Sequence, residues 1–157
     1  MKILSPLLSY FNSTGKIKAV GAVEGEFSKT IVLPITNIQN SFTLYFNPDN
    51  ELSNSVIRSI ELLTTTNVSV VQKNGQNYDN LSAGQAAGGI LVLSNVRREI
   101  LASFPLATIV RSTNQGKATF TDFSEVSWDS CFVFFPSPVA AANTYAVTVR
   151  VYFDKKI

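Results

Sequence analysis

The side chains best suited to catalysis are scarce in this chain. Its 157 residues include no histidine and a single cysteine, Cys131. The lack of histidine excludes Ser-His-Asp and Cys-His catalysis, histidine metal sites and the commonest general base. Cys131 opens the aromatic sequence Cys-Phe-Val-Phe-Phe, whereas a reactive thiolate needs a cationic and partly exposed setting. We therefore interpret Cys131 as a small buried core residue.

Two groups of carboxylates remain as candidates for acid-base chemistry or cation binding. Glu24 and Glu26 lie two positions apart and could point the same way at a strand end, as paired glycosidase acids do. Asp122, Glu125 and Asp129 lie close together in a loop-prone region, and carboxylate oxygens are ligands for Ca²⁺. The second group lacks the EF-hand spacing. We expect solvated surface charges in both places, with no catalytic residue, no metal and no cofactor.

Short binding motifs are weak in this sequence. Its glycines between residues 76 and 89 follow neither the Walker nor the dinucleotide-binding pattern: Gly84, Gly88 and Gly89. Asn-x-Ser/Thr sequences begin at Asn12, Asn67 and Asn80, about the number that chance provides in a chain so rich in these residues. Trp128 with Tyr45 or Tyr152 could form a platform on which a sugar stacks, but single aromatic residues more often belong to a core or an interface.

Composition and charge favour a packed domain that meets other proteins. The chain is 45% hydrophobic and only 15% charged, with a net charge of +2. A weakly charged surface is common where surface is covered by protein. The longest basic runs are two residues, Arg97-Arg98 and Lys155-Lys156, so the clustered footprint of a nucleic-acid-binding protein is missing. One cysteine forms no internal disulfide, and no run of 18 apolar residues predicts a membrane-spanning helix.

The elements that must position these residues are strands, and the last one is the clearest. Residues 144–153 alternate along their length. Side chains of a strand point to opposite faces with a period of two, which predicts a buried face and a wet one. The expected buried face is Tyr145, Val147, Val149, Val151 and Phe153. The expected wet face is Ala146, Thr148, Arg150 and Tyr152.

Further strands are predicted along the rest of the chain, with turn signals between them. They cover residues 16–24, 27–35, 42–46, 56–63, 68–72, 90–93, 96–104, 106–111, 118–123, 126–128 and 131–135. In 56–63 we expect Val56, Ile60 and Leu62 on one face, and 96–104 is also compatible with a helical turn. Asn74-Gly75 predicts a tight turn, and Pro34 predicts an edge strand, a bulge or a strand end. Residues 76–89 predict a long polar loop with at most one helical turn at 82–87. This pattern predicts an all-β antiparallel sandwich, a jelly roll of about eight strands.

The domain organisation follows from the same pattern. Residues 1–11 are apolar but interrupted by Ser5 and Pro6, so they predict an arm that packs on the domain or on a neighbour rather than a signal peptide. We therefore divide the chain into an N-terminal arm, 1–15, and a single jelly-roll domain, 16–157.

The C-terminal part of the chain resembles viral capsid proteins. The aromatic strand 131–135, the Pro136-Ser-Pro138 connection and the alternating strand 145–153 are similar to the last two strands of single jelly-roll capsid proteins. The size of the chain is similar to that of vertex (penton) or minor capsid proteins of icosahedral bacteriophages. Outside residues 131–153 the resemblance is one of architecture alone.

The resemblance implies a virion structural protein that assembles with itself, with a pentamer as the expected ring, and that contacts other capsid proteins or a receptor-binding spike protein. The lack of a basic arm departs from capsid proteins that package RNA directly and fits a shell whose genome lies elsewhere, for example beneath an internal membrane. We expect no direct nucleic-acid binding and no enzymatic activity. The alternative is a non-catalytic β-sandwich module that binds a carbohydrate or a protein receptor.

Overall fold

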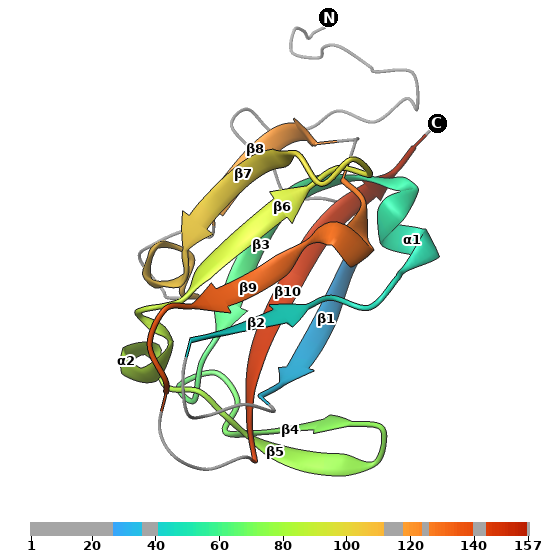
Figure 1. The fold of residues 1–157 in the computed structure, drawn as a ribbon. Coiled ribbons are helices and arrows are strands. Elements are labelled where there is room, and N and C mark those ends of the chain that lie inside the picture. The colour runs from blue at the N-terminus through green and yellow to red at the C-terminus, as the bar shows by residue number, and fades with distance from the viewer. Residues whose placement is uncertain (1–26, 36–40, 112–117, 124–125, 140–143, 157) are drawn as a thin grey trace, which may run out of the picture.

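Ten strands form two facing sheets in the computed structural model, which describes residues 27–35, 41–111, 118–123, 126–139 and 144–156 (Figure 1). The first sheet contains β1 (Phe27–Pro34), β3 (Ser55–Leu63), β8 (Ala118–Phe123) and β10 (Tyr145–Lys155), extended by the hairpin β4 (Val70–Lys73) and β5 (Gln76–Asn80). The second sheet contains β2 (Phe42–Tyr45), β6 (Ile90–Ser94), β7 (Ile100–Pro105) and β9 (Phe132–Phe135). Two four-residue helices, α1 (Asn50–Ser53) and α2 (Ala83–Ala86), and two 3₁₀ turns, η1 (Leu106–Thr108) and η2 (Trp128–Ser130), join them.

The strand order confirms the predicted jelly roll. Without the hairpin, the sheets run β1-β10-β3-β8 and β2-β9-β6-β7, and all neighbours in these two orders are antiparallel. Successive strands pass from one sheet to the other, except where β6 and β7 pair directly. Two four-stranded sheets connected in this way are the double-sheet arrangement called a jelly roll. The predicted strand at 16–24 and the predicted arm at 1–15 lie outside the described residues.

The last strand holds the first sheet together. β10 pairs with β1 from Phe27↔Phe153 to Pro34↔Ala146, and on its other edge with β3. Beyond the end of β3, β5 pairs with the same edge of β10. The backbone amides of Asp79 and Leu81 donate to the carbonyl oxygens of Thr144 and Ala146. The predicted inward face is confirmed: Val147, Val149, Val151 and Phe153 are fully buried, and Tyr145 packs partly buried against the core.

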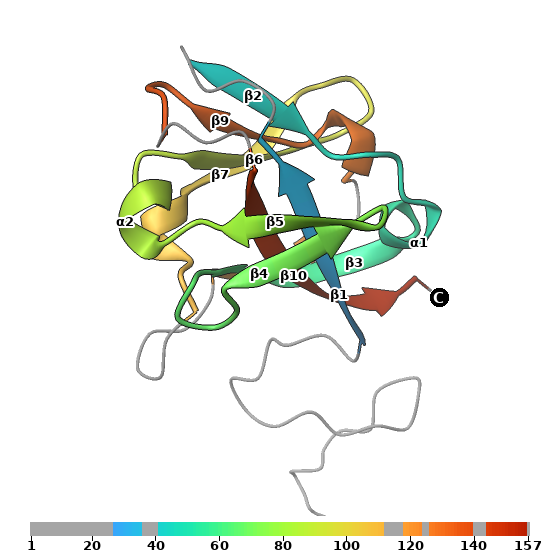
Figure 2. The same ribbon diagram turned by 90° about the horizontal axis from the view of Figure 1, so that it is seen from below.

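The opposite face of β10 was expected to be wet, and half of that expectation is wrong. Arg150 and Tyr152 are partly exposed, but Ala146 and Thr148 are buried. The pairing of β5 with residues 145–146 and the segment 67–71, which faces Thr148 across a pocket, cover this end of the strand. Figures 1 and 2 show the β4–β5 hairpin crossing this end of the sandwich.

The predicted inward set of β3 is also partly wrong. Ile60 and Leu62 face the core as expected, but Ile57 takes the place of Val56. The cause is a register shift, because Ile57 pairs with Phe153 while Ser59 pairs with Tyr152. A bulge inserts one extra residue and so changes which side chains face inward.

Three predicted segments adopt other structures. The loop at 76–89 contains β5 and α2, and α2 confirms the helical turn at 82–87 with a capping box between Ser82 and Gln85. The segment 106–111 is η1 followed by a single bridge, and 126–128 leads into η2 instead of forming a strand. In both cases apolar side chains enter the core one at a time, as Leu106, Ile109 and Trp128 do.

Two turn predictions are confirmed. Asn74 and Gly75 have φ values of 51° and 80° and join β4 to β5, which matches the left-handed central residues of a type I′ hairpin turn. Pro34 ends β1, where a missing N–H costs no ladder bond. The ambiguous segment 96–104 begins as a turn and becomes β7 from Ile100.

Tight packing between α2 and η1 generates a stability prediction. A Cβ at Gly89 would lie 2.7 Å from Leu106 Cδ1 and 2.8 Å from Phe135 Cε1, whereas a Cβ at Gly88 would meet nothing within 4 Å. We expect Gly89→Ala to lower the free energy of unfolding by about 1–3 kcal/mol, because overpacking a core forces its neighbours to shift. Urea unfolding measures the loss, with Gly88→Ala as the matched control. Equal stability of the two variants would contradict the packing.

Candidate functional site

Of the five carboxylates singled out in the sequence, the structure describes the side chain of Asp129 alone. Glu24, Glu26 and Glu125 lie outside the described residues, and Asp122 is placed only by the backbone of β8. Asp129 is exposed and accepts a hydrogen bond from Ser127 Oγ at 2.8 Å. No group of three acidic, cysteine or histidine residues among the described residues is arranged to hold a metal ion.

Cys131 is a buried thiol with weak backbone contacts. It is 0% exposed, and its Sγ lies 3.4 Å from the Ser94 amide and 3.4 Å from the Ser127 carbonyl oxygen. Burial raises the pKa of the thiol to about 12, and the charge of Asp129 adds to this, although a hydrogen bond from the Ser94 backbone acts in the opposite direction. The thiol therefore stays protonated near neutral pH, as a core residue should.

The three aromatic side chains do not meet in one platform. Trp128 is 1% exposed and packs on Phe46, with ring centroids 4.7 Å apart. Tyr152 lies on the first sheet and donates its hydroxyl to Glu61 Oε2 at 2.7 Å. Tyr45 alone is well exposed, at 52%, and its ring contacts Phe132 on the second sheet. A sugar platform built from Trp128 with either tyrosine is therefore not formed.

Among the Asn-x-Ser/Thr positions, Asn80 has a structural role. It is 1% exposed, and its side-chain amide donates to the carbonyl oxygens of Leu63 and Val68. Asn67 is exposed and accepts from the Thr64 amide, while Asn12 lies outside the described residues. Asn80 therefore ties the end of β3 to the segment before β4.

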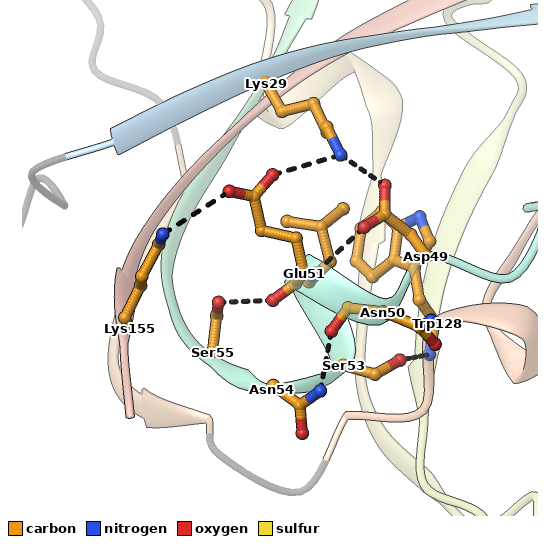
Figure 3. Close-up of polar contacts among 10 residues, drawn as sticks. Lys29, Asp49, Asn50, Glu51, Ser53, Asn54, Ser55, Trp128 and Lys155 are labelled. Carbon is orange, nitrogen blue, oxygen red and sulfur yellow. Dashed lines mark hydrogen bonds and ion pairs between the residues drawn. The ribbon is translucent and has the colours of Figure 1, made fainter. Parts of the chain in front are cut away.

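A charged cluster joins α1 to the first sheet (Figure 3). Lys29 Nζ, on β1, lies 2.7 Å from Asp49 Oδ2 and 3.2 Å from Glu51 Oε1, and Lys155 on β10 lies 3.9 Å from Glu51 Oε2. Asp49 also caps α1, because its Oδ1 accepts from the Leu52 amide at 3.0 Å. The sequence gives no local pattern for this cluster, because Lys29 and Asp49 lie 20 residues apart.

The ionisation of this cluster is coupled to folding. The hydrogen bond to Asp49 raises the pKa of the Lys29 ammonium, which outweighs its partial desolvation. Burial alone would raise the pKa of the Asp49 carboxyl, but the hydrogen bonds from Lys29 and the Leu52 amide together hold it below its ordinary value. Both groups are satisfied within the cluster, which marks it as a structural clamp.

The outward side of the second sheet is apolar. Two cross-strand rows run across it, Thr43–Phe134–Ile90–Pro105 and Tyr45–Phe132–Val92–Ser103. These residues alternate with the core residues of the same strands, such as Leu44, Val133 and Leu91. We call the six apolar members the apolar face: Tyr45, Ile90, Val92, Pro105, Phe132 and Phe134. Val92 is itself buried, Ile90, Phe132 and Phe134 are partly buried, and Tyr45 and Pro105 are exposed. A solvated sheet face normally carries polar residues, so this face is suited to contact with protein.

A second surface, the Val96–Ile100 patch, lies at the edge of the same sheet and has two exposed apolar side chains with the charged residues Arg97, Arg98 and Glu99 between them. Val96, in the β6–β7 turn, is 79% exposed, and Ile100, at the start of β7, is 65% exposed. Among the described strands, β7 lies at the edge of its sheet, and an edge strand offers backbone groups for pairing. Sequence reasoning missed both patches, since an apolar residue is as compatible with the core as with an interface until the face it occupies is known.

Comparison of the chain with protein-family models, curated proteins and solved structures gave no match. No helix in the described part of the chain is both long and apolar enough to cross a membrane. The candidate functional surface is therefore defined by geometry alone: the apolar face and the Val96–Ile100 patch of the second sheet.

The buried thiol gives a prediction about reactivity. With its pKa raised to about 12, Cys131 should resist alkylation by iodoacetamide in the native protein at pH 8. Mass spectrometry should show labelling only after the addition of denaturant. Rapid labelling of the native protein would show that the thiol is exposed and would contradict the burial described above.

The charged cluster gives a prediction about pH. Asn is as good a helix cap as Asp, so Asp49→Asn removes the charge and keeps the cap. We expect a loss of about 0.5–1 kcal/mol at pH 7, the range of a partly exposed ion pair. Because the pKa of Asp49 is lowered in the folded state, its contribution is present at neutral pH and is lost as the pH falls below about 4.

Urea unfolding at several pH values tests this pattern. The wild type and Asp49→Asn should converge in stability at low pH, whereas Asp49→Ala should remain less stable at every pH because it also lacks the cap. A constant gap between wild type and Asp49→Asn across the acidic range would contradict the assignment.

Proposed function

We propose that this chain is a non-enzymatic structural subunit of a virion, a capsid protein of the vertex (penton) or minor class. The observation that carries the proposal is the apolar face, whose two cross-strand rows contain no charged residue. An uncharged apolar sheet face loses little by leaving water and meets no like charge on a second copy of the chain. We take the occupant of this face to be a neighbouring copy.

The Val96–Ile100 patch supplies the second surface that a head-to-tail assembly requires. A closed ring needs two different complementary surfaces on each subunit, because its contacts are head to tail. The apolar face and the Val96–Ile100 patch provide two such surfaces on one sheet. A ring built in this way, plausibly a pentamer, is consistent with the jelly-roll order, an architecture shared by viral capsid and lectin domains.

The alternative remains a non-catalytic binding module. Fold alone does not separate the two, since jelly rolls serve both roles. The apolar face favours assembly, because Trp128 is buried and only Tyr45 among the candidate aromatics is strongly exposed. A sugar-binding surface normally offers aromatic faces together with polar groups that fix orientation.

Charge insertion into the two patches tests the proposal. We expect Tyr45→Glu or Ile100→Glu to weaken self-association at least tenfold, because a charge in the centre of an apolar interface costs about 1–2 kcal/mol or more. Both side chains are more than half exposed, so the monomer should keep its fold. Analytical ultracentrifugation over a range of concentrations gives the association constant, and electron microscopy shows whether rings form.

Val70→Glu is the matched control, because Val70 is 51% exposed on β4, away from both patches. It should associate like the wild type. A wild-type protein that stays monomeric at high concentration and is missing from its source particle would rule out the structural role. Specific binding to a glycan array by that monomer would then favour the module.

A further inference from the structure

A pocket lies on the other sheet, away from the apolar face. It has a volume of ≈ 430 Å³ and lies on the outer side of β1, β10 and β3, beneath the segment that leads into β4. Its lining is Thr30, Leu63, Asn67, Val68, Val71, Arg111, Thr148 and Arg150. This volume falls within the range of small-molecule sites, about 300–1,000 Å³.

Among the described residues, the pocket lining contains one guanidinium more than the carboxylates that pair with it. Arg111 is paired with Glu61, with 3.2 Å between Nη1 and Oε2, and Glu61 also accepts from Tyr152. No carboxylate among the described residues lies within ion-pair distance of Arg150, whose Nε donates to Thr30 Oγ1 at 3.2 Å. Among the described residues, two arginines and one carboxylate leave a local charge of +1, which one singly charged anion would neutralise.

A buried hydroxyl points to a missing partner. Thr148 is 0% exposed, lines the pocket, and its Oγ1 makes no hydrogen bond. An unpaired buried hydroxyl is costly and is rare in native proteins. Thr148 lies two residues before Arg150 and on the same face of β10, so a ligand that reaches Arg150 can also lie beside this hydroxyl.

We propose that this pocket binds a small aliphatic carboxylate. The carboxylate meets the guanidinium of Arg150, which is suited to bidentate contact with it, and the hydroxyl of Thr148 donates to the same ligand. The aliphatic body rests against Leu63, Val68 and Val71. The lining holds no aromatic ring on which a neutral sugar would stack, so recognition depends on charge and hydrogen bonds.

Titration with 3-methylbutanoate, followed by NMR of the backbone amides and arginine Nε–H groups, tests the proposal. We expect saturable shifts at Arg150, Thr148 and Val71 at millimolar concentrations. The uncharged isostere 3-methylbutanamide should cause none at matched ionic strength, and inorganic phosphate should bind more weakly than the carboxylate. The affinities of N-acetyl-leucine and 3-methylbutanoate are then compared. Tighter binding of N-acetyl-leucine indicates a peptide C-terminus as the natural ligand, and tighter binding of 3-methylbutanoate indicates a free acid.

Three variants complete the test. Arg150→Gln should weaken binding at least tenfold, whereas Arg97→Gln, which removes the same charge from the exposed β6–β7 turn, should leave it unchanged. Thr148→Val should weaken binding while raising the denaturation midpoint, because the unpaired hydroxyl is gone. This opposite response keeps the test decisive even if Arg150→Gln does not fold.

Two results would overturn the proposal. One is equal shifts with the acid and the amide, or tighter binding of phosphate. The other is unchanged affinity in Thr148→Val together with equal losses in the two arginine variants, which would show a general effect of net charge.

Discussion

The hydrogen bonding of β10 on both edges is the constraint on which the sandwich depends. One edge pairs with β1 along eight positions, and the other pairs with β3 and then with β5. The same strand supplies Val147, Val149, Val151 and Phe153 to the core, each contributing about 1.5–3 kcal/mol on burial. Because pairing and burial are fixed by the same residues, a one-residue slip would break the ladder and expose the core together.

The two sheets share one core but present different outer sides. The second sheet carries phenylalanine, tyrosine and isoleucine outward, with no charge in either row. The first sheet carries Thr30, Arg150 and Glu61 in one row, with Thr148 and Ser59 in the rows beside it. Both unpaired buried hydroxyls, Ser59 Oγ and Thr148 Oγ1, lie on this polar side. One side of the domain is thus suited to contact with protein and the other to recognition of a polar group.

Local periodicity was sufficient to predict the strands whose side chains alternate without interruption. The inward face of β10 and the positions Phe42 and Leu44 of β2 follow from a period of two. The method failed at β3, where a bulge changed the phase and exchanged Val56 for Ile57. The same reasoning wrongly predicted strands at η1 and η2. A short turn that places one or two apolar side chains in the core has the same composition as a short strand.

The candidate sites were harder to predict because they join distant parts of the chain. Lys29 and Asp49 are separated by 20 residues, and Arg111 and Glu61 by 50. These separations are too long to produce a recognisable local sequence motif. The pocket likewise combines residues from β1, β3, β10 and the segment before β4, so its excess charge is visible only after the sheet is assembled. By contrast, the burial of Cys131 could be predicted, since its aromatic neighbours already excluded the setting of a reactive thiol.

Strand β9 shows why the apolar face points to function rather than to folding. Its inward residues Val133 and Phe135 are buried in the core, with Phe135 stacked on Phe42 at 5.0 Å. Its outward residues Phe132 and Phe134 are only partly buried and lie on the opposite side of the sheet from that core. The core therefore does not require an aromatic residue at either position, and threonine or another polar β-former would serve the fold as well. Two phenylalanines at such positions are consistent with the proposed assembly surface.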